Sequence, residues 1–246
     1  MIPKIIHYAW FGNSEKPKNV QNCIDNWKKV LPDFQIVEWN EKNAPLHDNK
    51  FVEQAYEQKM WAFVSDYVRI AVIHRYGGIY LDTDVNLLKS LTPFLSDDFF
   101  TGFESEGLPF TAVFGAVAHH PVTESVMAFY RQSNFEKQNM TQYINTKIVS
   151  DILINEYQCD PHDSNQLLKN GIHIYSSNVL CNPSTESFAI HIRNGSWLKQ
   201  ASMSTRFGVF LRGQLRHKKQ IRCYLIMKQF QNKCKNIFSG FRFLLR

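Results

Sequence analysis

Cysteine is scarce in this chain of 246 residues, and the cysteines that it has are not placed to pair. None of them forms a C-x-x-C pair, and their number is odd: Cys23, Cys159, Cys181, Cys223 and Cys234. This pattern indicates reduced thiols and argues against a disulfide scaffold or a zinc site. We therefore expect a cytoplasmic protein.

Long apolar runs are also missing. No uncharged apolar run approaches the about 20 residues that a bilayer-spanning helix needs. The first residues show a strand pattern and lack the charged segment, apolar core and cleavage site of a secretory leader. With 44% hydrophobic residues, the chain can build one sizeable core and a small appendage.

Acidic residues are absent from the C-terminal part of the chain. Residues 1–186 hold 15 Lys and Arg and 22 Asp and Glu, a net charge of −7. Residues 187–246 hold 13 Lys and Arg and no Asp or Glu, a net charge of +13, so the whole chain carries +6. The pI of about 9.0 therefore arises from the tail. The acidic body and the lack of recognition motifs argue against a nucleic-acid-binding module.

The most informative segment is YGGIYLDTD at residues 76–84. A Gly-Gly turn is followed by a short apolar strand and then by Asp82 and Asp84. Because side chains alternate along a strand, the two carboxylates leave its end on the same side. Two oxygen ligands so placed suit a divalent cation that also binds phosphates. The alternative is a polar strand end without a function.

The residues before this segment predict a helix. Residues 60–76 place apolar side chains at helical spacing, and Gly77 and Gly78 end the helix. Asp66 and Arg69 are three residues apart and are therefore neighbours on the helix surface. Taken alone they indicate a weak surface ion pair. Beside the paired carboxylates they instead indicate the wall of a phosphate-binding cleft, with Arg69 facing an anion.

Apolar patterns along the chain predict strands that alternate with helices. We expect strands at residues 5–10, 34–39, 79–81, 99–103, 111–117, 172–175, 179–181 and 189–192, and helices at residues 19–30, 51–58, 61–76, 122–132 and 141–157. This alternation predicts an α/β fold with a mostly parallel central sheet and helices on both faces. Ligands of such sheets bind beyond the carboxyl ends of the strands, which Trp10, Asp82 and Asp84 follow.

Several segments together resemble the sugar transferases that contain a DXD motif. They are residues 2–12, Trp27 with Trp39-Asn40, the A-x-x-SD-x-x-R pattern of residues 62–69, residues 77–84, and Gly195-Ser196-Trp197. That family includes bacterial capsule and lipopolysaccharide transferases and fungal α-mannosyltransferases, and more distantly the glucosylating domains of large clostridial toxins. The resemblance covers about residues 2–200 and implies a GT-A-like nucleotide-diphospho-sugar transferase fold.

The resemblance also implies the chemistry. It implies a retaining glycosyltransferase that uses Mn²⁺ or Mg²⁺, a nucleotide-diphosphate sugar donor and a glycan or lipid-linked glycan acceptor, in cell-surface polysaccharide or lipopolysaccharide synthesis. The implied catalytic residues are Asp66, Arg69, Asp82 and Asp84, and His191 would join Asp82 and Asp84 as a metal ligand. The implied donor-binding residues are Trp10, which would stack on the base, and Tyr80, Glu104, Ser196 and Trp197.

Structural roles stay open for several of these residues. Trp10 suits core packing, His191 suits the edge of a strand, and Glu104 suits a solvated carboxylate. Many relatives carry two histidines ahead of the Ser-Trp pair, whereas this chain has His191 followed by Ile192 and Arg193.

Two other functions share parts of the pattern. An aspartate-nucleophile phosphatase also has an apolar strand that ends in D-x-D, but its signature has Thr or Val where this chain has Asn86. A non-catalytic sugar-nucleotide-binding module on the same fold would have lost the paired carboxylates. Metal-dependent release of nucleotide from nucleotide sugars separates both from a glycosyltransferase.

The chain shows no internal repeat, and we expect a catalytic domain at residues 1–205 and a basic tail at residues 206–246. The tail predicts an amphipathic helix, with basic residues lying off an apolar stripe of Cys223, Met227, Phe230, Cys234, Ile237, Phe241 and Leu244. We expect this helix to dock on an anionic membrane, at its cytoplasmic face. The alternative is a helix packed against the domain.

Overall fold

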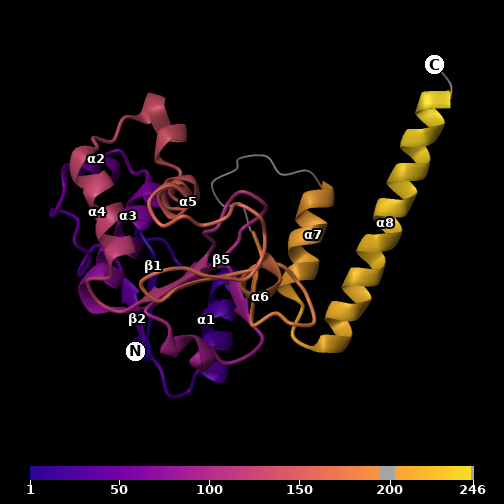
Figure 1. Cartoon of the computed structure of the whole chain (residues 1–246), viewed down its shortest axis with the longest axis horizontal. Helices are drawn as coiled ribbons and strands as arrows, with labels where there is room; N and C mark the ends of the chain where they lie inside the picture. The colour runs from indigo at the N-terminus through magenta and orange to yellow at the C-terminus, as the bar shows by residue number, and fades with distance from the viewer. Residues whose placement is uncertain (194–202, 245–246) are drawn as a thin grey trace.

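The computed structural model describes residues 1–193 and 203–244, and within the last two helices it describes the side chains of residues 207–231. Figure 1 shows the arrangement of the elements. In chain order they are β1 (Ile5–Ala9), α1 (Lys18–Val30), β2 (Gln35–Trp39), α2 (Lys50–Glu57), α3 (Trp61–Tyr76), β3 (Gly78–Leu81), β4 (Val85–Leu87), η1 (Thr92–Ser96), β5 (Phe99–Gly102), β6 (Val113–Ala116), α4 (Pro121–Gln132), η2 (Lys137–Tyr143), α5 (Asn145–Asn155), β7 (Gln166–Leu167), β8 (Ile172–Tyr175), α6 (Ser177–Leu180), β9 (Ala189–His191), α7 (Met203–Gly213) and α8 (Lys218–Leu244).

Seven strands form the central sheet in the order β2-β1-β3-β6-β5-β8-β7. Strand β1 pairs in parallel with β2 and β3, and β5 pairs in parallel with β8. Strand β6 is antiparallel to β3 and β5, and the edge strand β7 is antiparallel to β8. Five of the seven strands therefore run in one direction, and the prediction of a mostly parallel sheet is confirmed.

Side chains of the strands alternate between two hydrophobic cores, one on each face of the sheet. On β3, Ile79 and Leu81 pack into the core that includes Trp27 of α1, whereas Tyr80 packs into the core that includes Val68 of α3. Figure 1 shows α2, α3, α4 and α5 on one side of the sheet and α1 on the other. The predicted α/β fold with helices on both faces is confirmed.

Helix α3 ends at a turn that only glycine fits. Gly77 and Gly78 have φ angles of 65° and 108°, which are unfavourable for residues with a Cβ atom. A Cβ atom on Gly78 would lie 2.8 Å from both His7 Nε2 and Ile5 O, and one on Gly77 would lie 2.9 Å from Ala118 N. The two glycines therefore allow the chain to pass from α3 into β3 close beside β1.

His7 is buried in β1, and its hydrogen bonds require the neutral ring. Its Nδ1 accepts from Trp39 Nε1 at 3.0 Å, which leaves Nε2 to donate to Gly77 O at 2.9 Å. Burial lowers the pKa of His7 from 6.5 to about 4. The unfolded chain therefore takes up a proton at a higher pH than the folded protein does.

We expect His7 to make the fold less stable as the pH falls from 6.5 to about 4, with a loss of at most ~3 kcal/mol. Urea unfolding of the wild type and of His7→Gln at neutral and mildly acidic pH measures this contribution. The loss on acidification should be smaller in His7→Gln than in the wild type, and unchanged in the exposed control His47→Gln. An equal loss in all three proteins would contradict the prediction.

Two elements differ from their predictions. Residues 179–181, predicted as a strand, lie in and just after the short helix α6. The backbone N–H and the hydroxyl of Ser177 both donate to Asp163, and this contact with a remote loop begins the helix. The helix predicted at residues 141–157 begins only at Asn145, because Ile144 has an extended backbone between η2 and α5.

A separate two-stranded sheet of β4 and β9 supports the C-terminal helices. Leu215, Ile221 and Tyr224 pack with Ile190 of β9 in a small third core, and Asn86 Nδ2 donates to Leu215 O. Figure 1 shows that α8 then extends away from the body of the molecule. The division of the chain at residue 205 stays a prediction.

The cysteines whose side chains are described are free thiols: Cys23, Cys159, Cys181 and Cys223. Within residues 1–193 and 203–244, no helix has both the length and the apolar character that crossing a membrane requires.

Candidate active site

The candidate site lies at the carboxyl ends of β1 and β3, which are parallel neighbours. Trp10 follows β1, and Asp82 and Asp84 follow β3. The β4–β9 ladder brings in a residue that is distant in sequence, because His191 pairs with Val85. Strand pairing therefore places His191 beside Asp84.

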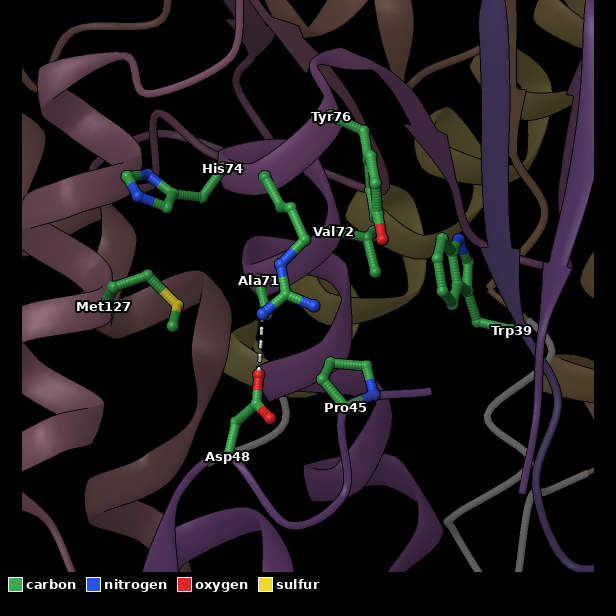
Figure 2. A pocket seen from close by; sticks show the side chains of 9 residues that line it. Trp39, Pro45, Asp48, Ala71, Val72, His74, Tyr76 and Met127 are labelled. Atoms are coloured by element: carbon green, nitrogen blue, oxygen red, sulfur yellow. Dashed lines mark hydrogen bonds and ion pairs between the residues drawn. The ribbon is translucent and has the colours of Figure 1, made fainter. Parts of the chain in front are cut away.

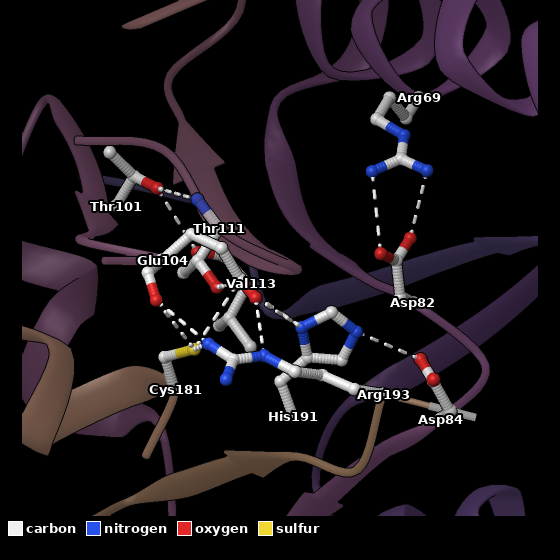
Figure 3. A network of polar contacts seen from close by, with 10 residues as sticks. All are labelled: Arg69, Asp82, Asp84, Thr101, Glu104, Thr111, Val113, Cys181, His191 and Arg193. Carbon is white, nitrogen blue, oxygen red and sulfur yellow. Dashed lines mark hydrogen bonds and ion pairs between the residues drawn. The ribbon is translucent and has the colours of Figure 1, made fainter. Parts of the chain in front are cut away.

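Arg69 of α3 holds two carboxylates, as Figure 3 shows for Asp82. Its Nη2 lies 3.0 Å from Asp66 Oδ1 and 2.9 Å from Asp82 Oδ1. The side chains of Arg69, Asp66 and Asp82 are only 12%, 17% and 23% exposed, which excludes the weak surface ion pair. The guanidinium also lies 5.0 Å from the centre of the Tyr80 ring, and its Nε is buried with no partner in the described part of the chain.

The two carboxylates on Arg69 are not fully neutralised by it. Burial disfavours their charged forms, and the single guanidinium offsets this only in part. Burial therefore raises the pKa of Asp66 to about 6 and also raises the pKa of Asp82. A further positive charge at Asp82 would stabilise both carboxylates.

His191 lies between two carboxylates (Figure 3). Its Nε2 is 3.3 Å from Asp84 Oδ1, and its Nδ1 is 3.1 Å from Glu104 Oε2. Burial disfavours the imidazolium, but the two carboxylates outweigh burial and raise the pKa of His191 well above its usual value. A histidine that donates one nitrogen to a carboxylate and presents the other to a ligand cluster is typical of metal sites in proteins.

Glu104 is held by several donors and is largely buried. Thr111 Oγ1 donates to it at 2.6 Å, Arg193 Nε donates at 2.6 Å, and the Cys181 thiol donates at 3.1 Å. These donors and His191 outweigh burial and lower the pKa of Glu104 to about 2. The oxygens of Glu104 are therefore engaged by protein donors and orient His191, and its contact with a sugar stays a prediction.

Three ligand groups lie close enough together to hold one metal ion. Single ligand atoms of Asp82, Asp84 and His191 lie within 4.8 Å of one another. Carboxylate oxygens suit both Mn²⁺ and Mg²⁺, and imidazole is a common ligand of divalent transition metals. The site also carries more negative than positive charge, even with a protonated His191. Four carboxylates (Asp66, Asp82, Asp84 and Glu104) face two guanidinium groups and one imidazolium (Arg69, Arg193 and His191). A metal ion bound by His191 would displace the proton from its Nε2. A divalent cation fits both the donor set and the charge.

The structure describes two of the other four predicted donor-binding residues, Trp10 and Tyr80. Trp10 is partly buried, and its Nε1 donates to Ser14 O at 2.8 Å. Tyr80 is 2% exposed and packs under Arg69, which it supports. Its contact with the donor stays a prediction. Ser196 and Trp197 lie outside the described residues.

The sequence did not point to Thr111, Cys181 or Arg193 as parts of the site. Only Arg193 had a local signal, because it follows His191 in the segment where many relatives carry a second histidine. Thr111 and Cys181 reach Glu104 only through the fold, since they lie 7 and 77 residues away from it.

Two pockets in the described structure lie away from the carboxylates of the candidate site. Figure 2 shows a pocket at the C-terminal half of α3 that is lined by Trp39, Pro45, Asp48, Ala71, Val72, His74, Arg75, Tyr76 and Met127. A second pocket is lined by residues of α2 and α4 and their flanking loops. Neither pocket includes any residue of the Arg69 or His191 clusters, so the chemistry of the side chains identifies the site and the pockets do not.

Comparison with known proteins now gives the class of enzyme. Residues 17–101 match the family model of the glycosyltransferase sugar-binding region containing the DXD motif. An uncharacterized glycosyltransferase of Acanthamoeba polyphaga mimivirus is 27% identical over 214 residues, which are 80% of this chain and 84% of the relative. Inositol phosphoceramide mannosyltransferase 1 of Schizosaccharomyces pombe is 24% identical over 213 residues, which are 80% of this chain and 62% of the relative.

Among solved structures, the PaToxG glycosyltransferase is 17% identical, with a TM-score of 0.48 over 63% of this chain and 70% of that chain. The sequence matches confirm the predicted enzyme class, a glycosyltransferase. They also confirm the resemblance to the sugar transferases that contain a DXD motif. The sheet order and the helices on both of its faces agree with the GT-A-like fold that this resemblance implies.

Proposed function

We propose that this protein is a metal-dependent, retaining glycosyltransferase that moves a sugar from a nucleotide-diphosphate donor to a glycan or lipid-linked glycan. The cluster of Asp82, Asp84 and His191 beside Arg69 carries the proposal. Synthesis of cell-surface polysaccharide or lipopolysaccharide is the proposed setting.

The proposed metal ligands are Asp84 and His191, with one oxygen of Asp82. Bound Mn²⁺ or Mg²⁺ would neutralise negative charge on the leaving diphosphate. Glu104 keeps the Nδ1 side of His191 engaged, which leaves Nε2 directed toward Asp84. Arg69 keeps Asp82 in place and adds a fixed positive charge next to the diphosphate side of the site. Ser196 and Trp197 are proposed to donate hydrogen bonds to the same diphosphate.

Retention of configuration is proposed from the family resemblance, and the state of the carboxylates bears on the route of the reaction. Asp66 and Asp82 are engaged by Arg69, and Glu104 by Arg193, His191 and Thr111. Asp84 lies against His191. No carboxylate of the described site is therefore free to form a covalent bond to the sugar, which favours attack of the acceptor on the face from which the diphosphate leaves.

The test is release of free nucleotide from a panel of nucleotide sugars, with and without Mn²⁺ or Mg²⁺. We expect metal-dependent release from one donor type, with the same anomeric configuration in the product. Hydrolysis of simple phosphate esters instead would favour an aspartate-nucleophile phosphatase. That reaction requires Asp82 to attack phosphorus, and Asp82 is held by Arg69.

Replacing Trp10 with alanine tests the proposed base stacking. We expect the Michaelis constant for the donor to rise about 5- to 100-fold, because stacking on an aromatic ring contributes ~1–3 kcal/mol. Turnover should change much less, since the base is bound equally in the ground and transition states. A variant that loses turnover while calorimetry shows unchanged nucleotide binding would indicate that Trp10 only packs in the core.

Replacing Glu104 with glutamine tests its role in positioning His191. The variant keeps the shape of the side chain but loses the charge that Arg193 and His191 contact. We expect the metal concentration for half-maximal activity to rise about 10- to 100-fold. The matched control is Glu106→Gln, because Glu106 is exposed and contacts His162. Equal metal dependence in both variants would show that Glu104 does not position a metal ligand.

A further inference from the structure

Exposed large apolar side chains gather in the C-terminal helices. Nine such side chains occur in the described part of the chain, and five of them lie in α7 and α8. Their exposed fractions are 57% for Phe207, 60% for Phe210, 53% for Ile226, 47% for Met227 and 67% for Phe230. The body of the protein has no comparable concentration among its described residues.

Helix α8 has two apolar sides, and only one of them is packed. Ile221 and Tyr224 are buried in the core with β9. Because successive residues of an α-helix are about 100° apart, Ile226, Met227 and Phe230 lie on roughly the opposite side. These three residues therefore do not attach α8 to the body, and an apolar stripe remains on the outer side of the helix.

The charge around this stripe is of one sign. The segment from residue 187 to the C-terminus holds 13 Lys and Arg and no Asp or Glu. Lys219 and Arg222 are exposed on α8 close to the stripe. An apolar stripe with a basic surround on a helix that does not span a membrane is typical of a helix that lies in the interface of a bilayer.

We propose that the outer side of α8 docks on an anionic lipid bilayer. A second copy of the chain that meets this one tail to tail is a poor occupant, because its tail would bring the same excess of positive charge to the contact. An anionic bilayer complements this charge, and each basic residue near it strengthens binding about fivefold. The proposal goes beyond the transferase chemistry and does not depend on it.

Flotation of the full chain with vesicles tests the proposal. We expect binding to phosphatidylcholine vesicles that contain phosphatidylglycerol at low salt, with strong weakening at high salt or with pure phosphatidylcholine. Phe230→Glu should weaken binding at least about tenfold, because it places a charge where an aromatic ring enters the interface. The matched control is Gln229→Glu, which makes the same charge change one residue away and off the stripe, and which should lose much less.

Three results would overturn the proposal. The first is an equal loss in the two variants, and the second is no binding of the wild type to the anionic vesicles at low salt. The third is a self-associated wild-type protein that Phe230→Glu converts to monomers without lipid, which would make the stripe a contact between copies. Release of nucleotide without acceptor should be the same in Phe230→Glu and the wild type, so this result is separate from any failure of the proposed reaction.

Discussion

Asp84→Ala should reduce turnover by more than tenfold and leave the fold intact. Asp84 is proposed as a metal ligand, and its side chain is 17% exposed at the edge of the site, so its loss removes a ligand without opening the core. A tenfold loss corresponds to ~1.4 kcal/mol of transition-state stabilisation. Asp82→Ala should be nearly as damaging. Turnover is measured at saturating Mn²⁺, and the melting temperature is measured in parallel.

A suitable control is Asp33→Ala, because Asp33 pairs with Lys4 before the start of β2, at the other end of the strands. That variant should keep wild-type turnover. If Asp84→Ala kept more than about a tenth of wild-type activity, this result would contradict the proposed metal site.

Arg69→Met should lower both stability and activity. The variant leaves Asp66 and Asp82 largely buried without their shared cation, and removing one partner of a buried ion pair costs about 3–5 kcal/mol. Urea unfolding measures the change in stability. Release of nucleotide should fall as well, because Arg69 holds one of the proposed ligands.

The pH dependence provides a second readout for Arg69. Without the guanidinium, the pKa values of Asp66 and Asp82 in the folded protein rise further above their unfolded values. A carboxyl group with a raised folded pKa stabilises the fold at low pH and loses that contribution as the pH rises. The difference in stability between Arg69→Met and the wild type should therefore shrink on acidification. Arg69→Lys, which keeps the charge but not the planar fork, should lose less stability than Arg69→Met. A loss below ~1 kcal/mol in Arg69→Met at neutral pH would contradict the buried cluster.

The sequence predicts those parts of the site that depend on residues close together in the chain. The YGGIYLDTD segment predicts a turn, a strand and two carboxylates on one side of its end. The spacing of Asp66 and Arg69 predicts neighbours on a helix. The burial of Asp66 and Arg69 does not follow from this spacing. It depends on how much of α3 other elements cover, and Tyr67, Ile70 and Ile73 are buried in addition to the expected apolar stripe.

The positions of strands and helices were largely predictable for the same reason. Periods of two and 3.6 residues in apolar side chains reflect which side of an element faces the core. The exception at residues 179–181 arose because Asp163, from a distant loop, begins helix α6. Contacts of that kind leave no periodic trace in the sequence.

By itself the sequence therefore determined the class of fold, the class of enzyme and the paired carboxylates, because each depends on residues close together in the chain. Tertiary structure decided which distant groups complete the site. Pairing of β4 with β9 brings His191 to Asp84, and the fold then surrounds Glu104 with Thr111 and Arg193. It also decided that α8 packs through Ile221 and Tyr224 and leaves its outer stripe exposed. A helical pattern shows that an apolar side exists, but only the partners available in space determine which side is covered.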